Sequence, residues 1–175
     1  MQVLMTFTFR ATTAADTAKL PAIERAAGQR FRQLAELAWI ADAPVISVAE
    51  HQRYAANAMS WLALADALPV GFVLAEALDD SLFIAEISLH TAWQGQGLGR
   101  QLLAYVIEQA RERGFSSLSL TTFCDVAWNA PWYARMGFEI LPEASLSQAL
   151  RQKREAETAH GLAYESRCAM RLMLR

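Results

Sequence analysis

A glycine-rich stretch, Gln94-Gly-Gln-Gly-Leu-Gly99, is the feature of the sequence that most restricts the fold. An extended apolar run from Leu82 to Leu89 precedes it, and an amphipathic helix pattern from Leu98 to Arg113 follows it. Glycines at such a strand-to-helix turn leave backbone N–H groups without partners and allow a ligand to approach closely. Because these donors lie at the positive end of the helix dipole, the turn is suited to a phosphate or pyrophosphate.

The composition indicates one globular domain. The 175 residues are 54% hydrophobic and 19% charged, a balance typical of a chain with a packed core rather than a disordered one. The formal net charge of −2 provides no general attraction to nucleic acid or to anionic membranes. We therefore expect a single domain over residues 1–175, with neither nucleic acid nor a membrane as its partner.

The cysteines and the N-terminal residues predict a cytoplasmic protein. Cys124 and Cys168 are too few for a disulfide framework, and neither has a histidine nearby in the sequence, so we interpret both as inert thiols. Residues 1–10 alternate in polarity and lack the apolar core of a signal peptide. No run approaches the roughly 20 apolar residues that span a bilayer.

Hydrophobic periodicity predicts a mixed α/β order of elements. In the first half we expect a strand at 3–10, helical sequence from Thr13 to about Ile40 broken near Gly28, and a short helix beginning at the capping box Ser47-Val-Ala-Glu50. Three apolar stretches follow, at 59–65, 70–77 and 82–90. The short polar turns between them favour an antiparallel meander.

The second half begins with the helix from Leu98 to Arg113, which Gly114 ends. A strand at 117–123 follows, and because a crossover helix precedes it we expect it to run parallel to 82–90. The remaining predicted elements are a short helix at 129–136, a strand that begins with residues 137–140, a mostly polar helix at 145–160 and a closing strand at 167–174.

The stretch from Leu82 to Ile140 resembles the GNAT superfamily of acyl-CoA-dependent N-acyltransferases. Three features carry the resemblance, in chain order: a strand ending in Glu86-Ile-Ser-Leu89, the turn Gln94-x-x-Gly97-x-Gly99, and the motif Tyr133-x-x-x-Gly137-Phe138. Residues 125–133 are similar to the same stretch of a bacterial subgroup, most of whose members are described no further than as acetyltransferases. The resemblance implies a GNAT-like fold, in which a mixed, mostly antiparallel central sheet carries helices on both faces.

The resemblance also implies that acetyl-CoA is the co-substrate and that no metal takes part. The peptide N–H groups of the turn, with the start of the following helix, would hold the pyrophosphate. The pantetheine arm would lie between the strands 82–90 and 117–123, paired with main-chain groups of the first. The implied cofactor-binding residues are Ile87, Ser88, Leu89, Gln94, Gly95, Gln96, Gly97, Leu98, Gly99, Arg100 and Asn129.

Two residues are candidates for catalysis. By resemblance, Tyr133 is the acid that protonates the leaving thiolate, and a phenol with a pKa of about 10 needs help from position and burial to do so. Glu86 is the candidate base, directly or through water, on the same strand face as Ser88 and opposite Leu89. The alternatives are a structural ion pair for Glu86 and a core aromatic for Tyr133. His90 is a further candidate base, or simply a solvated residue at a strand end.

The sequence departs from the family pattern at two positions. Val126 stands where the family commonly has asparagine, and Asn129 is instead expected to be the N-cap of the short helix. Gln94 stands where many members have arginine, and Arg100 is the candidate to compensate for the missing charge.

The expected reaction is transfer of an acetyl group to a primary amine of a small molecule, by direct attack in a ternary complex. Asp125, Trp128 and Trp132 are the candidate substrate-binding residues, with turn formation and ordinary packing as their alternatives. Two other functions stay open: a non-catalytic acyl-CoA-binding sensor or partner module, and an acetyltransferase of a protein N-terminus or another macromolecular amine. Many such relatives dimerise, so a homodimer is a further expectation. The acceptor and the acyl-chain length carry no readable motif.

Overall fold

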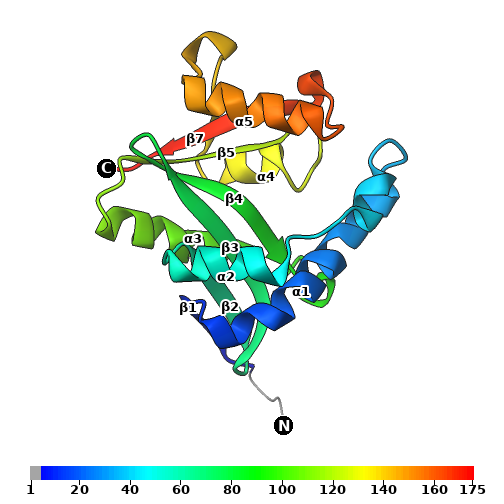
Figure 1. Ribbon diagram of the computed structural model, residues 1–175, viewed down its shortest axis with the longest axis vertical. Coiled ribbons are helices and arrows are strands. Elements are labelled where there is room, and N and C mark those ends of the chain that lie inside the picture. Colours follow the sequence, from blue (N-terminus) through cyan, green and yellow to red (C-terminus); the bar gives the residue numbers. More distant parts are fainter. Residues whose placement is uncertain (1–4) are drawn as a thin grey trace. The chain divides into compact units, whose positions relative to one another are not determined.

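The computed structural model describes residues 5–175, which form two compact units. The first unit comprises residues 5–76 and 85–107, and the second comprises residues 77–84 and 108–175. Three elements run from one unit into the other: β3 (Leu68–Leu78), β4 (Ser81–Leu89) and α3 (Leu98–Glu112) (Figure 1). A single domain over the whole chain stays a prediction.

The described strands form a seven-stranded sheet in the hydrogen-bonded order β1-β2-β3-β4-β5-β7-β6. The other strands are β1 (Phe7–Ala11), β2 (Ser60–Ala65), β5 (Ser117–Phe123), β6 (Glu139–Ile140) and β7 (Arg167–Met173). Strand β4 runs parallel to β5, whereas β2 is antiparallel to β1 and β3, and β7 is antiparallel to β5 and β6. The prediction of a mixed, mostly antiparallel sheet is therefore confirmed, including the parallel pair joined by a crossover helix.

In the first unit, α1 (Leu20–Ala27) and α2 (Val48–Ala56) cover one face of the sheet. Side chains alternate along a strand, so the even-numbered residues of β2 and β3 share this face. The resulting buried cluster consists of Leu20, Ile23, Leu62, Leu64, Phe72 and Leu74. Full burial of each such side chain contributes about 1.5–3 kcal/mol relative to exposure.

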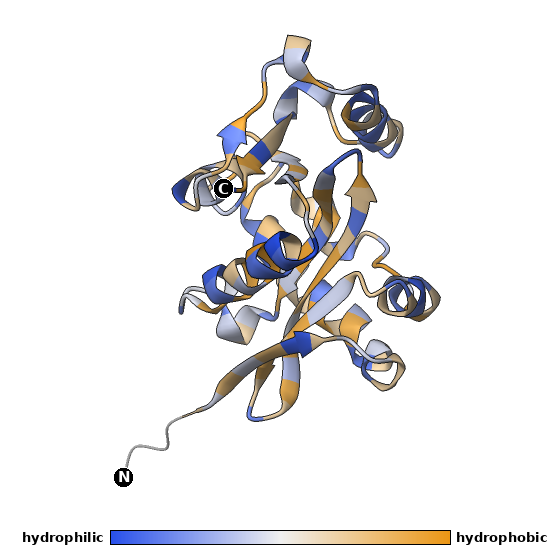
Figure 2. Cartoon of the chain, turned by 90° about the vertical axis from the view of Figure 1, so that its left-hand side faces the viewer, coloured by the Kyte–Doolittle hydropathy of each residue, from blue (hydrophilic) through white to orange (hydrophobic). Residues whose placement is uncertain are grey.

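Helix α3 covers the opposite face of the first unit. Its apolar residues recur at helical spacing and are buried: Leu98, Leu102, Leu103 and Val106. A Cβ at Gly71, which points away from Phe72, would lie 3.6 Å from Cδ2 of Leu102. The predicted helices on both faces are thus found. Figure 2 shows strands of mainly hydrophobic residues and helices with hydrophilic sides.

In the second unit, hydrogen bonds of two arginines connect α5 (Gln148–Ala159) to β7. The buried Arg154 side chain donates to the carbonyls of Tyr164 (3.0 Å) and Arg167 (2.9 Å). The Arg167 guanidinium in turn donates to Glu157 at 2.9 Å. These charge-assisted bonds hold the helix, the loop before β7 and the strand together.

The helical prediction for residues 13–40 was only partly right. The one α-helix there is α1, flanked by 3-10 helices at Ala14–Lys19, Gly28–Gln33 and Ala38–Asp42, although the break at Gly28 is confirmed. Pro21 has no N–H to donate to a preceding turn, so an α-helix cannot continue through it from residue 14. The predicted strand at 3–10 begins at residues outside the described range, and its described part is β1.

The cap predicted at Ser47 is confirmed, whereas the helix predicted at 145–160 begins later than expected. Ser47 caps α2 as expected, because its Oγ accepts the Glu50 N–H at 3.2 Å. The helix expected from residue 145 begins later, at Gln148, because Ser147 supplies the cap by accepting the Leu150 N–H at 3.2 Å. Residues Glu143–Ser145 form a separate 3-10 turn.

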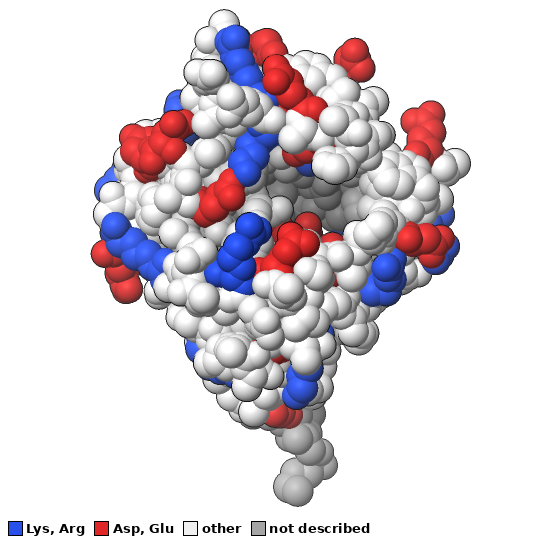
Figure 3. Space-filling model, in the orientation of Figure 1, with Lys and Arg blue, Asp and Glu red and all other residues white. Residues whose placement is uncertain are grey.

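Charge of both signs is intermixed on the face of the molecule drawn in Figure 3. No surface of a single sign dominates that face, in keeping with the formal net charge of −2. Within residues 5–175, no helix combines the length and the apolar character needed to cross a membrane.

Candidate active site

The glycine-rich turn follows a short 3-10 helix, Thr91–Trp93, and leads into α3. Gly95 and Gly97 have φ of +78° and +82°, a left-handed conformation that glycine adopts without strain. A Cβ at either position would meet nothing within 4 Å. The glycines are therefore needed for the path of the backbone, and the space beside them is open to a ligand.

The start of α3 presents four backbone donors without acceptors. The first helical hydrogen bond runs from the Gln101 N–H to the Gly97 carbonyl at 3.2 Å. The N–H groups of Gly97, Leu98, Gly99 and Arg100 consequently lack acceptors within the helix, and no side chain of the described residues caps them. Such a group of donors at the positive end of a helix dipole favours a bound anion.

Gln94 ties this turn to the end of β4. Its Nε2 donates to the Leu89 carbonyl at 2.8 Å, and its backbone N–H donates to Thr91 at 3.2 Å. His90 is similarly engaged, because its Nδ1 accepts the Ala92 N–H at 3.1 Å. The neutral glutamine thus fixes the turn and supplies no charge, and the exposed Arg100 places a positive charge in the first turn of α3.

Glu86 lies half-buried on β4 and accepts a hydrogen bond from the Ser88 Oγ at 3.2 Å. The two side chains therefore share one face, as strand alternation predicts. Leu89 lies on the other face, where its Cδ1 would be 2.8 Å from a Cβ at Gly71. Ala85 packs against the cluster beneath α1 and α2.

Tyr54 of α2 is a residue that sequence reasoning missed. Burial raises the pKa of its phenol, and the charges of Glu76, Glu50 and Glu86 raise that pKa further. The Arg53 guanidinium lies 5.4 Å from the Tyr54 ring centroid and opposes them. Three carboxylates from α2, β3 and β4 thus act on one phenol. In the sequence, this arrangement is indicated only by the spacing of Glu50 and Tyr54, which are four residues apart on a helix and therefore neighbours on its surface.

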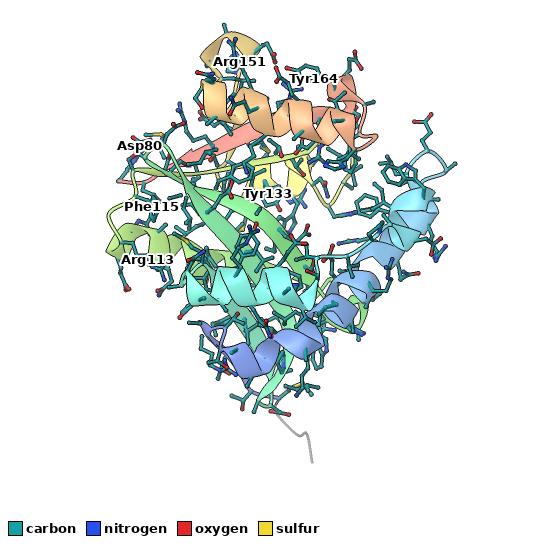
Figure 4. All side chains as sticks on the ribbon, viewed as in Figure 1. Asp80, Arg113, Phe115, Tyr133, Arg151 and Tyr164 are labelled. Carbon is teal, nitrogen blue, oxygen red and sulfur yellow. The ribbon has the colours of Figure 1, made fainter. Side chains whose placement is uncertain are left out.

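Tyr133 lies in the second unit, on α4 (Ala130–Arg135), and Figure 4 labels it there. Its side chain is buried and is contacted edge-on by Trp132 and Phe138, with ring centroids 5.0 and 5.7 Å away. Gly137 has φ of +101°, which turns the chain back so that the Phe138 N–H donates to the Tyr133 carbonyl at 3.2 Å. The motif Tyr-x-x-x-Gly-Phe is therefore a helix end that packs the phenylalanine on the tyrosine.

Asn129 is the N-cap residue of α4, as predicted, but its side chain makes no capping hydrogen bond to the helix. Its Oδ1 instead accepts from the Thr122 hydroxyl at 2.8 Å and from the Phe123 N–H at 3.3 Å. The side chain therefore ties the end of β5 to the start of α4. Val126, at the family's usual asparagine position, is buried.

The remaining candidates also belong to the second unit. Asp125 is exposed, whereas Trp128 and Trp132 are half-buried, and Trp132 contacts Tyr133. The candidate residues of β4 and the glycine-rich turn belong to the first unit. In the described part of the chain, no three His, Cys, Asp or Glu side chains gather in a way that could hold a metal ion.

Solved structures with this fold include several acetyltransferases. PaiA N-acetyltransferase from Thermoplasma acidophilum, in complex with coenzyme A, has a TM-score of 0.71 at 14% identity, over 97% of this chain and 99% of that one. Ribosomal-protein-S18-alanine N-acetyltransferase from Escherichia coli has a TM-score of 0.65 at 18% identity, over 96% and 94%. N-acetylglutamate synthase from Neisseria gonorrhoeae, with coenzyme A and N-acetyl-glutamate, has a TM-score of 0.70 at 18% identity, over 100% of this chain but 36% of that one. At these identities the likeness is one of fold.

The model of the acetyltransferase (GNAT) family matches residues 28–138. This range covers well over half of the chain and contains β4, the glycine-rich turn, β5 and the tyrosine motif. The chain therefore belongs to the acetyltransferase (GNAT) family.

Proposed function

We propose that the protein transfers an acetyl group from acetyl-CoA to a primary amine of a small molecule. The observation that carries this proposal is the set of four backbone N–H groups, from Gly97 to Arg100, without acceptors at the start of α3. Membership of the acetyltransferase family supports the reaction class. The coenzyme A bound by PaiA and by N-acetylglutamate synthase supports a diphosphate as the anion.

The turn suits a diphosphate for three reasons. Each hydrogen bond from an N–H to a phosphate oxygen is charge-assisted and contributes about 1.5–3 kcal/mol. The dipole of α3 adds about 0.3–1 kcal/mol at its N-terminus. Arg100 supplies a positive charge in the first turn of the helix. The main chain of Ile87, Ser88 and Leu89 is the proposed partner of the pantetheine arm.

In the proposed reaction, the amine nitrogen attacks the thioester carbon, so that a C–N bond forms and the C–S bond breaks. Glu86 accepts the proton that the amine loses, directly or through water, and Tyr133 donates its proton to the leaving sulfur. Solvent exchange then returns both groups to their starting states. Neither a metal nor a covalent enzyme intermediate is required.

Charge supports an amine as the acceptor. Glu50, Glu76 and Glu86 all act on Tyr54, and such a group of carboxylates favours a cation over an anion nearby. Asp125, Trp128 and Trp132 are the proposed acceptor-binding residues, because a carboxylate pairs with ammonium and indole rings attract cations. The net charge of −2 supports a small molecule over nucleic acid.

The test is to mix the protein with acetyl-CoA and a panel of small amines and to measure free thiol, with peptides bearing a free N-terminal amine as a second panel. We expect thiol release with at least one small amine. Binding of coenzyme A without thiol release in either panel would support a sensor. Thiol release with peptides alone would support a macromolecular acceptor. No binding of coenzyme A would refute the proposal.

We further propose that the protein works in a reducing, cytoplasmic compartment as a homodimer. Two free cysteines support the first part. Mass spectrometry of protein taken from its native cells would find both thiols reduced, and light scattering would give twice the chain mass. Oxidised thiols or a monomer would overturn the respective part.

A further inference from the structure

The two cysteines of the chain lie on one face of the sheet, where β5 and β7 pair. Thr122 is opposite Cys168 in the antiparallel register, and two residues further along the Cys124 N–H donates to the Ser166 carbonyl at 2.8 Å. Side chains alternate along a strand, so Cys124 lies on the same face as Thr122 and therefore on the same face as Cys168. On that face the Cys124 and Cys168 thiols contact each other as hydrogen-bonding partners.

The same register brings side chains into contact on the opposite face. Phe123 is opposite Arg167, whose guanidinium carbon lies 4.5 Å from the centroid of the Phe123 ring. Cys168 lies within β7, whereas Cys124 directly follows the last residue of β5, where the chain bends. One thiol is thus carried by a paired strand and the other by the residue just past the end of its neighbour, so a bond between them requires no break in the sheet.

The two thiols differ in exposure. Cys124 is half-buried, whereas Cys168 is 7% exposed. Burial, followed by contact with Cys124, raises the pKa of the Cys168 thiol to about 12, although the charges of Arg154 and Arg167 oppose this. A dissolved oxidant therefore reacts with Cys124 and not with Cys168. Cys168 is a poor nucleophile toward dissolved reagents, but it is held against Cys124, and such proximity replaces a high concentration of reactant.

We propose that Cys124 and Cys168 form a disulfide within one chain when the protein meets hydrogen peroxide, and that a dithiol reductant opens it again. This inference is independent of the proposed function. In the first step the Cys124 sulfur attacks a peroxide oxygen, so that an S–O bond forms and the O–O bond breaks. The departing hydroxide takes the thiol proton of Cys124 and leaves as water.

In the second step the Cys168 sulfur attacks the Cys124 sulfur. The S–S bond forms, the S–O bond breaks, and the second hydroxide takes the Cys168 proton and leaves as water. The two sulfurs together lose two electrons, which the peroxide gains. In the reverse direction the dithiol exchanges with the disulfide, becomes a disulfide itself and returns its two protons to the cysteines. Each cysteine is inert by its own sequence context, and only the fold makes the two partners.

The full-length protein treated with hydrogen peroxide tests the pair, with mass spectrometry as the readout. We expect the mass of the single chain to fall by about 2 Da, because two thiol hydrogens are lost. Peptide maps without reductant should join the peptides that contain Cys124 and Cys168, and dithiothreitol should restore the starting mass.

Two variants test the order of the steps. Cys168→Ala removes the second thiol, so oxidation of Cys124 should end in a sulfenic acid that dimedone traps, or in the sulfinic acid beyond it. Cys124→Ser keeps a small polar group at the bend and should leave Cys168 unmodified by peroxide. Melting temperatures near that of the wild type show that the variants are folded, and the measurement on the wild type depends on neither.

Peroxide-treated wild type that gains oxygen at Cys124 without a bridge, that stays unmodified, or that links two chains instead of bridging one would overturn the inference. Oxidation of Cys168 in Cys124→Ser as fast as the wild type forms its bridge would overturn the assigned order.

Discussion

Replacing Gly97 by alanine separates the cost of bending the backbone from the cost of losing a ligand. Gly97 and Gly114 have the same φ of +82°, and a Cβ at either would meet nothing within 4 Å. Both alanine variants therefore carry the same strain without a clash, about 1–2 kcal/mol for an L-residue in the left-handed region. At about 2–4 °C per kcal/mol for a chain of this size, each should melt roughly 2–8 °C below the wild type.

Only Gly97→Ala places a methyl group beside the four free N–H groups at the start of α3. If a diphosphate binds there, displacing it from one charge-assisted hydrogen bond costs about 1.5–3 kcal/mol. That loss corresponds to an affinity for coenzyme A lower by roughly 10- to 150-fold. Gly114 ends α3 and is the matched control, so Gly114→Ala should bind coenzyme A as the wild type does.

Thermal melting and calorimetric titration with coenzyme A measure the two costs on the same samples. We expect equal melting temperatures for the two variants and unequal affinities. Equal affinities at equal melting temperatures would refute the reasoning, because the added methyl group would then touch nothing that coenzyme A uses.

Three further predictions concern other parts of the molecule. Tyr133→Phe should lower turnover by about 10²-fold, as expected for loss of a general acid, while affinity for acetyl-CoA is kept; unchanged thiol release would remove Tyr133 from the mechanism. His51 is buried with neither ring nitrogen bonded within residues 5–175, and burial lowers its pKa although Glu50 partly opposes this. As the pH falls, the unfolded chain therefore takes up the proton before the folded chain does. The free energy of unfolding, measured in urea, should be largest above pH of about 6.5 and should fall as the pH drops below it. If the same pH dependence persists in His51→Leu, it does not arise from His51. Burial, with contact from Cys124, raises the pKa of the Cys168 thiol to about 12, so iodoacetamide at pH 8 should leave Cys168 unmodified in the folded protein and modify it in urea, and rapid native labelling seen by mass spectrometry would count against that burial.

Local patterns in the sequence predict the parts of the fold that local physics decides. The strand β4, the glycine-rich turn and α3 follow from apolar periodicity and from glycine at positive φ, and the parallel β4–β5 pair follows from the crossover rule. The 3-10 helices around α1 were not predicted, because the effect of Pro21 on the preceding turn competes with helical periodicity over the same residues.

The candidate site could be predicted only where a motif marks it. Tyr54 carries no motif, and the carboxylates that act on it come from α2, β3 and β4, which only the fold brings together. Asn129 was correctly predicted as the residue before the helix. Its side chain, however, accepts hydrogen bonds from two donors at the end of β5 and none from the helix itself. That choice depends on tertiary contacts, which outweigh capping preference at a six-residue helix.

The backbone amides themselves give the most direct test of diphosphate binding. In ¹⁵N-labelled protein titrated with coenzyme A, the N–H resonances of Gly97, Leu98, Gly99 and Arg100 should shift more than those of any other four consecutive residues, because these donors gain charged acceptors. Saturating coenzyme A that leaves these four resonances in place would contradict the proposed site.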